Sequence, residues 1–235
     1  MSSSPGRLVA NYSIFNAQEL IYDSLVSVTR AVDEIRVYDG RFIEYRCPCG
    51  TDHDNSCDNT AREIEQFQAE YPLAPVVKYI PFPAMPEVEK RSRMMQDGAF
   101  GDVVFVIDDD ELFFGRTEPL REFADTKPAK FAYIDSLLAG GGHGTGVSMP
   151  LARLFVRTPG LRYDGAFFRI ADNSGLVVDM RSDNKNVAYG QRRHGRFYLH
   201  PSARIVGLYE NYRTKARVKA KTDYNNLVAK RDWNR

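Results

Sequence analysis

Hydrophobic and polar positions follow two alternating periods along the first half of the chain, and these predict strands and helices in turn. Apolar runs at residues 8–15, 34–38, 76–80 and 103–107 have the length and β-branched content of strands. Between them, apolar residues recur every three or four positions, as in helices with one buried face. Because a βαβ crossover makes neighbouring strands parallel, we expect an α/β protein with a mainly parallel central sheet flanked by helices.

The helices are predicted from their starts as well as from their faces. Asn16 with Glu19, and Thr60 with Glu63, have the spacing of capping boxes, and a third short helix is predicted over about residues 87–96. The apolar residues expected on the buried faces are Ile21, Leu25, Val28 and Val32 in the first helix, and Ile64, Phe67 and Tyr71 in the second.

The second half of the chain is less regular. Strands are expected at residues 131–134, 152–157, 176–180 and 196–200, which suits a smaller second sheet. The glycine-rich run 140–146 is predicted to be a mobile loop and a candidate lid, with His143 in solvent.

We treat residues 1–235 as one domain in three parts. A ligand-binding half is expected over about 1–115, a second half over about 116–207, and a basic helical tail over about 208–235. In the tail a base stands at every second position, which spreads charge around a helix. These bases are Arg213, Lys215, Arg217, Lys219 and Lys221.

Composition excludes some partners and compartments. The chain has 32 Lys and Arg against 31 Asp and Glu, so bulk charge gives no reason to expect a nucleic-acid partner. Residues 1–7 lack the apolar core of a signal peptide, and no apolar run reaches the length of a membrane span. We therefore expect a cytoplasmic protein. For the basic tail we favour a solvated helix, and contact with a membrane surface is the alternative.

The most informative stretch is residues 103–111, in which five apolar residues run directly into four acids. The apolar part predicts a strand buried on both faces, and the acids follow at its carboxyl end, where open α/β sheets bind ligands. Crowded carboxylates repel one another unless a cation neutralises them. Asp108 and Asp110 point the same way on an extended chain and offer the oxygen ligands that Mg²⁺ or Mn²⁺ requires. The alternative is a polar turn with solvated acids.

All three cysteines lie in one loop, residues 46–59, together with His53. Cys47, Cys49, His53 and Cys57 could hold a structural zinc ion, but their spacing lacks the usual paired Cys-x₂-Cys knuckles. We therefore favour a polar loop over a zinc site. An odd number of cysteines also argues against a secreted disulfide framework.

Two further features lie near the predicted strand ends. Asp39 occupies the position at which doubly wound folds often place an acid against a nucleoside, although from the residues alone we favour an Asp-Gly turn that ends a strand. Lys90, Arg91 and Arg93 gather on the third helix just before the acidic strand, where they could hold diphosphate oxygens. A solvated helix face is the alternative for at least one of them.

Taken in order, these segments resemble family 2 glycosyltransferases of the GT-A fold over about the first half of the chain. The matching segments are Asp39-Gly40-Arg41, Asp58-Asn59-Thr60, Glu89-Lys90-Arg91 and the Asp-x-Asp motif Asp108-Asp109-Asp110-Glu111. The resemblance implies a nucleotide-sugar donor, with a UDP- or GDP-sugar expected, and an acceptor hydroxyl on a glycan, a lipid-linked molecule or another compound. The donor-binding residues that it implies are Asn11, Asp39, Lys90, Arg91 and Asp108.

The same resemblance extends to the metal site. Asp108 and Asp110 are expected to bind the ion, and His200 at the end of a late strand is expected to complete the site, with His194 as the alternative. A neutral imidazole ligand suits Mn²⁺ better than Mg²⁺. Relatives often place a histidine after the turn at residues 160–165, where this chain has Phe167 and Phe168 instead.

The expected reaction is metal-dependent transfer of a sugar from a nucleoside diphosphate to a hydroxyl, with inversion. Asp164, Asp172 and Asp135 are candidates for the base that takes the hydroxyl proton, and Asp164 is preferred because it follows the tyrosine of the acceptor-side turn. Two alternatives stay open. One is a nucleotidyltransferase that makes a nucleotide sugar, and the other is a non-catalytic binding module that contains zinc.

Overall fold

The computed structural model describes residues 6–139, 147–164, 169–179 and 197–208, together with Lys219 and Asp223. Its helices are α1 (Ile21–Val28), α2 (Thr60–Glu70), α3 (Glu87–Gln96) and α4 (Glu118–Thr126). The strands of its large sheet are β1 (Leu8–Ile14), β2 (Glu34–Asp39), β3 (Val76–Pro81), β4 (Val103–Asp108), β5 (Glu111–Gly115), β6 (Phe131–Ala139), β7 (Val147–Val156), β11 (Phe197–Tyr198) and β12 (Ala203–Leu208). A small separate sheet contains β8 (Arg162–Tyr163), β9 (Arg169–Asp172) and β10 (Gly175–Asp179).

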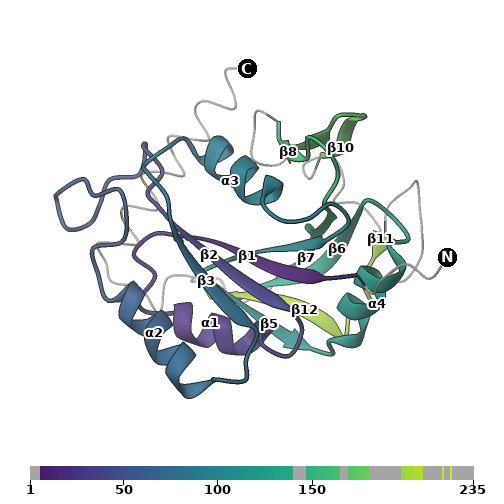
Figure 1. Ribbon diagram of the computed structural model, residues 1–235, viewed down its shortest axis with the longest axis horizontal. Coiled ribbons are helices and arrows are strands. Elements are labelled where there is room, and N and C mark those ends of the chain that lie inside the picture. Colours follow the sequence, from purple (N-terminus) through teal and green to yellow (C-terminus); the bar gives the residue numbers. More distant parts are fainter. Residues whose placement is uncertain are drawn as a thin grey trace.

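The predicted α/β class is confirmed, with a mostly parallel sheet flanked by helices and a smaller second sheet (Figure 1). Among the described residues, the large sheet has the order β3-β2-β1-β4-β7-β6-β12-β5, with β11 beside β6. The first four strands in this order are all parallel, as the βαβ pattern predicts.

The order of the strands changes direction at β1. The chain passes from β1 to β2 on one side, and returns through β4 to the other side of β1. Ser13, near the end of β1, lies opposite Asp108, the last residue of β4. Ligands of open α/β sheets bind at such a switch point, outside the carboxyl ends of the strands.

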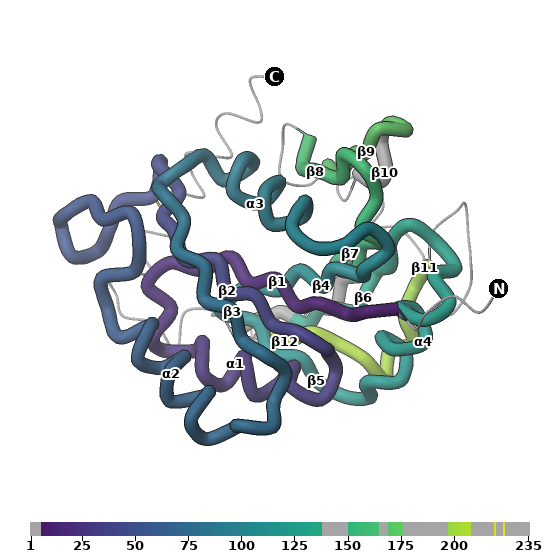
Figure 2. The backbone as a smooth tube through the Cα atoms, in the orientation of Figure 1, coloured from purple at the N-terminus to yellow at the C-terminus, as the bar shows by residue number. Residues whose placement is uncertain are grey.

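Both faces of β4 are buried, as the unbroken apolar run predicts. Phe105 and Ile107 pack in the core that contains α1 and α2, whereas Val104 and Val106 pack in a second core with Met95 of α3 and residues of the small sheet. Helix α3 therefore covers one face of the sheet, and α1 and α2 cover the other (Figure 2).

The two predicted capping boxes are wrong. Helix α1 begins at Ile21, and Asn16 lies before it in a left-handed backbone conformation with φ of 53°. Thr60 is the first residue of α2, and its hydroxyl accepts a hydrogen bond from the main-chain N–H of Ala17. Both side chains bond to distant parts of the chain instead of capping a helix. The partners of Asn16 are Cys47 and Cys57 in the loop 46–59.

Five elements were not predicted from the sequence, namely β5, α4, β8, β9 and β12. Strand β5 begins at Glu111, so the acidic run continues into a strand instead of forming a free turn. β5 pairs with β12 at the far edge of the sheet and lies close to α1, which curls the sheet around this helix. No helix in the described ranges is long and apolar enough to span a membrane.

Several expectations lie outside the described residues. These are the glycine run 140–146 with His143, the pair Phe167 and Phe168, the turn with His194, and the basic tail apart from Lys219 and Asp223. The ammonium of Lys219 is 2.6 Å from Asp223 Oδ2, one helical turn away.

Candidate functional site

The acidic run lies at the carboxyl end of β4. Asp108 is the last residue of this strand, Asp109 and Asp110 form the turn, and Glu111 opens β5. Asp110 and Glu111 are 4% and 6% exposed, and the side chain of Glu111 folds back to accept a 2.9 Å hydrogen bond from the main-chain N–H of Asp108. The acids are therefore largely enclosed, which excludes the alternative of a solvated turn for these two.

Two arginines from different parts of the chain meet these acids. Arg91 Nη1 of α3 donates to Asp108 Oδ1 at 3.1 Å, while Arg91 Nε donates to Glu87 Oε1 at 2.7 Å. Arg153 Nη1 of β7 lies 3.6 Å from Asp108 Oδ2, and Arg153 Nη2 is paired with Glu111. Each oxygen of Asp108 thus faces one guanidinium.

The charges in this cluster are strongly coupled. Burial raises the pKa of Glu111 to about 7, with Arg153 opposing the rise and Asp108 and Asp110 adding to it. Burial works against the charge of Arg91, yet Asp108 and Glu87 raise its pKa above the ordinary value. Both arginines are therefore cations at neutral pH.

Among the described residues, two guanidiniums face the carboxylates of Glu87, Asp108 and Glu111, and Asp110 lies close to Glu111. Burial is the main cause of the raised pKa of Glu111, and the neighbouring Asp108 and Asp110 add to it. Carboxylate oxygens are the ligands that Mg²⁺ and Mn²⁺ prefer. The donor set therefore fits the metal that the sequence predicts, and Asp108 and Asp110 remain its predicted ligands.

Lys90 does not present its ammonium to the acids. Its side chain is fully buried, and Nζ donates to the carbonyl of Ile14 at 2.9 Å and to the carbonyl of Gly40 at 2.6 Å. It also lies over the ring of Phe42, 5.2 Å from the centroid. Lys90 thereby joins the ends of β1 and β2 directly beneath α3. A donor-binding role for Lys90 stays a prediction.

Arg93, the third base of the helix, has the solvated position expected for one member of the group. Its guanidinium pairs with Glu89 at 2.6 Å, and both side chains are about half exposed, at 54% and 48%.

Asp39 is completely buried at the end of β2. Its carboxylate accepts hydrogen bonds from the N–H and the hydroxyl of Ser56, at 3.0 Å and 2.7 Å, and from the hydroxyl of Tyr79. It thus fixes the loop 46–59 to the carboxyl edge of the sheet. Its predicted role near a nucleoside stays a prediction, because these contacts explain its burial without a ligand.

Asn11 lies in the middle of β1 and is also fully buried. Its side-chain amide donates to the carbonyl of Met94 at 2.7 Å, which ties α3 to β1. Its Oδ1 has no hydrogen-bond partner in the described part of the chain. The structure thus places this predicted donor-binding residue beneath the helix that carries Arg91.

The structure does not bring His200 to the acids. Strand β12 pairs with β5 so that Gly207 lies opposite Glu111 and Ala203 opposite Gly115. His200 precedes Ala203, at the end of β12 that is remote from Glu111, and its Nδ1 lies 2.9 Å from the hydroxyl of Ser202. Its role as a metal ligand stays a prediction that this geometry does not support.

The three candidate bases have different surroundings. Asp164 follows Tyr163, whose N–H donates to Ser92 of α3 at 3.1 Å, so it lies beside the helix that carries Arg91. Its side chain is 43% exposed and 3.5 Å from Arg169.

Asp172 is held in a turn instead, by Lys130 at 2.8 Å and by Ser174 at 2.6 Å. Asp135 is buried in β6 beside β12. The role of a catalytic base stays a prediction for Asp164 and an open alternative for the other two.

Arg153 and Tyr163 are site residues that the sequence did not reveal. Arg153 stands in the predicted strand 152–157, and a lone cation between apolar neighbours is the signal that could have identified it. Tyr163 is buried, and its pKa is raised by burial while the nearby Arg91 and Arg153 oppose that rise. Both residues lie on elements far along the chain, and the sheet topology brings them to the end of β4.

Comparisons with known proteins give a structural likeness without a family. No family model matches the chain, and no curated protein matches it. The crystal structure of GalNAc-T7 with UDP, GalNAc and Mn²⁺ matches it with a TM-score of 0.45 and 13% identity, covering 97% of this chain and 48% of that one. The chain thus spans about half the length of that protein, and a TM-score this low assigns no family to it.

Proposed function

We propose that this protein is a metal-dependent glycosyltransferase that moves a sugar from a nucleoside-diphosphate donor to an acceptor hydroxyl. The observation that carries the proposal is the meeting of Asp108 and Glu111 with Arg91 and Arg153 at the switch point of the sheet, with Asp110 close to Glu111. Carboxylate oxygens suit a divalent cation, and two buried guanidiniums suit phosphate oxygens.

Asp108 and Asp110 would hold Mn²⁺ or Mg²⁺, which supplies positive charge that neutralises the departing diphosphate. Arg91 and Arg153 would stabilise the same developing charge, in a site enclosed by α3 and the small sheet. Since both arginines are paired with Asp108 here, a bound diphosphate would compete with that carboxylate for them.

Asp164 would accept the proton of the acceptor hydroxyl as that oxygen attacks the anomeric carbon, which inverts the configuration. Its support is its place beside Tyr163, a buried neighbour of Arg91 and Arg153, and its 43% exposed side chain, which an acceptor can reach. Asp135 and Asp172 have less room for this role because both are buried.

Ligand-dependent thermal unfolding tests the proposal. UDP, GDP, CDP and dTDP are added in turn, each with Mn²⁺, with Mg²⁺ and with a chelator. A nucleotide at a hundred times its dissociation constant adds about 2.7 kcal/mol, which raises the melting temperature of a chain of this size by roughly 5–10 °C. We expect one nucleotide to stabilise the protein only with metal.

The site is tested with Asp110→Asn, and Asp125→Asn on the exposed side of α4 is the matched control. The first variant should lose the metal-dependent shift, and the second should keep it. Nucleotide-sugar turnover is then followed as release of the nucleoside diphosphate. Absence of any shift at millimolar nucleotide, or synthesis of a nucleotide sugar with release of pyrophosphate, would contradict the proposal.

A further inference from the structure

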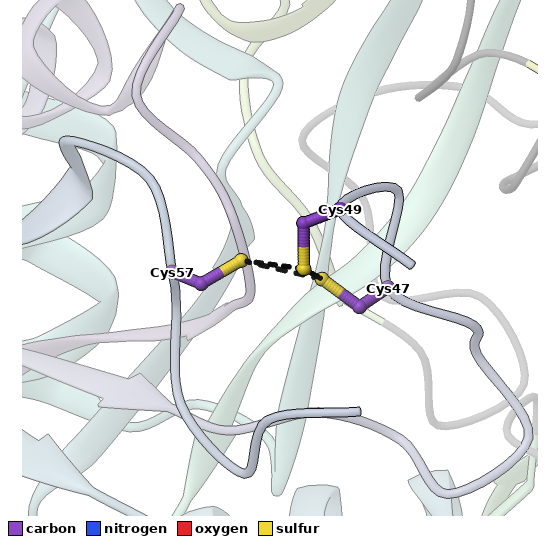
Figure 3. Close-up of side chains that lie close together, drawn as sticks. All are labelled: Cys47, Cys49 and Cys57. Atoms are coloured by element: carbon purple, nitrogen blue, oxygen red, sulfur yellow. Dashed lines mark hydrogen bonds between the residues drawn. The ribbon is translucent and has the colours of Figure 1, made fainter. Parts of the chain in front are cut away.

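The cysteines of the loop 46–59 form a compact triangle outside the acidic site. Cys47 Sγ lies 2.7 Å from Cys49 Sγ and 3.3 Å from Cys57 Sγ, and Cys49 and Cys57 are 3.2 Å apart. Figure 3 shows the three sulfurs converging from two parts of the loop. Among the described residues, these thiols form the one group of three or more Cys, His, Asp or Glu whose ligand atoms all lie within 4.8 Å of one another.

We propose that Cys47, Cys49 and Cys57 bind one zinc ion that fastens this loop to the carboxyl edge of the sheet. This site is independent of the glycosyltransferase proposal and uses none of its residues. It also replaces our sequence-based preference for a polar loop, and it omits His53, which lies outside the group.

The sulfur geometry suits a tetrahedral ion with an open position. An ion about 2.3 Å from each sulfur would lie about 1.4 Å out of the plane of the triangle, on one side of it. Ideal tetrahedral angles require sulfurs about 3.8 Å apart, so the triangle opens by about 1 Å or less. The fourth position is then available to water or to another ligand.

Thiol chemistry gives a reason for the convergence. Neutral thiols are weak donors and weak acceptors, so hydrogen bonds among them offer little to hold three together. All three cysteines are free, and a disulfide would join two and leave the third. Zinc binds all three as thiolates, whose protons are released on binding, and sulfur ligands select zinc over Mg²⁺ or Mn²⁺.

Asn16 supports the cluster from the end of β1. Its amide nitrogen donates to Cys47 Sγ at 3.5 Å, and its Oδ1 accepts from the N–H of Cys57 at 2.8 Å. Such outer hydrogen bonds orient metal ligands and are a regular part of metal sites. Asn16 is 4% exposed and holds a left-handed conformation, which asparagine adopts more readily than most residues other than glycine.

A bound ion would stabilise a loop that has almost no apolar residues with which to pack. It contains no helix or strand, and apart from its cysteines Pro48 is its one residue that is not charged, polar or glycine. It nevertheless delivers Ser56 to Asp39 and to the main-chain N–H of Asn16, at 2.7 Å in each case. Cys47 is buried while Cys49 and Cys57 are exposed, so an ion can reach the site from solvent.

The test measures metal content in the full chain, purified with a reducing agent and without a metal-affinity step. We expect one zinc per chain, and a cobalt-substituted protein with the strong visible absorption of a tetrahedral thiolate site. Cys57→Ser and Cys49→Ser should each lower the zinc affinity at least tenfold. His53→Ala in the same loop and Asp110→Asn in the acidic site are the matched controls, and both should retain zinc.

Thiols are counted in the folded protein before chelation and in the unfolded chain after it, which separates zinc from oxidation. Three reactive thiols after chelation, shielded in the folded protein before it, support the site. One reactive thiol would show a disulfide and overturn it, as would three thiols with no zinc or cobalt bound after reconstitution. Because the wild-type cobalt titration needs no variant, failure of a serine variant to fold leaves the test intact. Mn²⁺-dependent nucleotide binding is measured separately, so either proposal can fail alone.

Discussion

Replacing Lys90 by methionine should remove a pH dependence of stability that originates at a single buried amine. Burial lowers the pKa of Lys90 to about 7, with Asp39 opposing the shift and Arg91 adding to it. In the unfolded chain the same group has a pKa near its ordinary value of about 10.4. Between these two values the unfolded state binds more protons than the folded state, so stability rises with pH in this window.

The magnitude follows from the two pKa values. Integrating the proton difference from pH 7 to pH 9 gives a gain in the free energy of unfolding of about 2 kcal/mol in the wild type. For a chain of this size, that corresponds to roughly 4–8 °C in melting temperature. Below about pH 6 both states are protonated at this site, and its contribution no longer changes.

Methionine fills nearly the same volume but cannot donate to the carbonyls of Ile14 and Gly40. The carbonyl of Ile14 still accepts a hydrogen bond from the N–H of Gly40 at 3.1 Å, whereas the carbonyl of Gly40 loses its Lys90 partner. A buried carbonyl without a partner costs about 1–3 kcal/mol, so Lys90→Met should be less stable than the wild type at pH 9. The difference should shrink by about 2 kcal/mol at pH 7, where the wild type itself bears the cost of the buried charge.

Urea unfolding at several pH values between 6.5 and 9.5 measures the free energy of unfolding of each variant. The difference between the wild type and the variant is then compared across pH, because the contributions of other titrating groups cancel in that difference. Lys78→Met is the matched control, because Lys78 is 51% exposed at its side chain, and it should keep the wild-type slope. If Lys90→Met and the wild type gain stability equally from pH 7 to pH 9, the assignment of the pH dependence to Lys90 is refuted. Nucleotide binding to the same variant tests the predicted donor-binding role.

Three further predictions concern the other charged groups. Because Glu111 loses its proton near pH 7, Mn²⁺ affinity measured by calorimetry should increase from pH 6 to pH 8, and Glu111→Gln should flatten this profile. Breaking the buried ion pairs with Arg153→Met should destabilise the fold by about 3–5 kcal/mol in urea, whereas Arg204→Met on the surface should change it by less than about 0.5 kcal/mol. Burial would raise the pKa of Asp172, but Lys130 and Ser174 outweigh it and lower this pKa to about 2. Asp172→Asn should therefore cost about 2 kcal/mol at pH 7, and most of this difference should be lost as the pH falls from 4 towards 2. An equal cost at pH 2.5 would contradict the assignment.

Strong local periodicity made the N-terminal half of the fold predictable. Strands β1, β2, β3 and β4 and helix α3 lie within one residue or so of the positions expected from the apolar pattern. Strand β5 was not predicted because its first residue, Glu111, is the last of the four consecutive acids and does not have the pattern of a strand start. Helix α4 was missed although it has proline in its first turn, and it ends at Lys127 in a left-handed conformation, a place usually held by glycine.

The site was predictable only where its residues share one edge of neighbouring parallel strands. Asp108 and Arg91 belong to elements whose order follows from right-handed crossovers, so their proximity could be expected. Arg153 could not be placed, because β7 enters the sheet antiparallel between β4 and β6, and no local pattern encodes that order.

Helical geometry separates three bases that look alike in the sequence of α3. Lys90 points beneath the helix and ends on main-chain carbonyls, Arg91 reaches the acids, and Arg93 remains at the surface with Glu89. The group could be recognised from the sequence, but the role of each member depends on which strand ends lie under the helix.

The failed capping boxes have the same origin as the proposed zinc site. Asn16 and Thr60 carry the side chains of helix caps, yet they lie on either side of a loop that has almost no apolar residues with which to pack. Asn16 supports Cys47 and Cys57, and Thr60 bonds to Ala17, so both side chains fix the ends of the loop instead of the ends of helices. Tertiary contacts outweigh the local capping preference here because the loop holds Ser56 against Asp39. In our two proposals, soft thiolates bind zinc and hard carboxylates bind Mn²⁺ or Mg²⁺ along the same edge of the sheet.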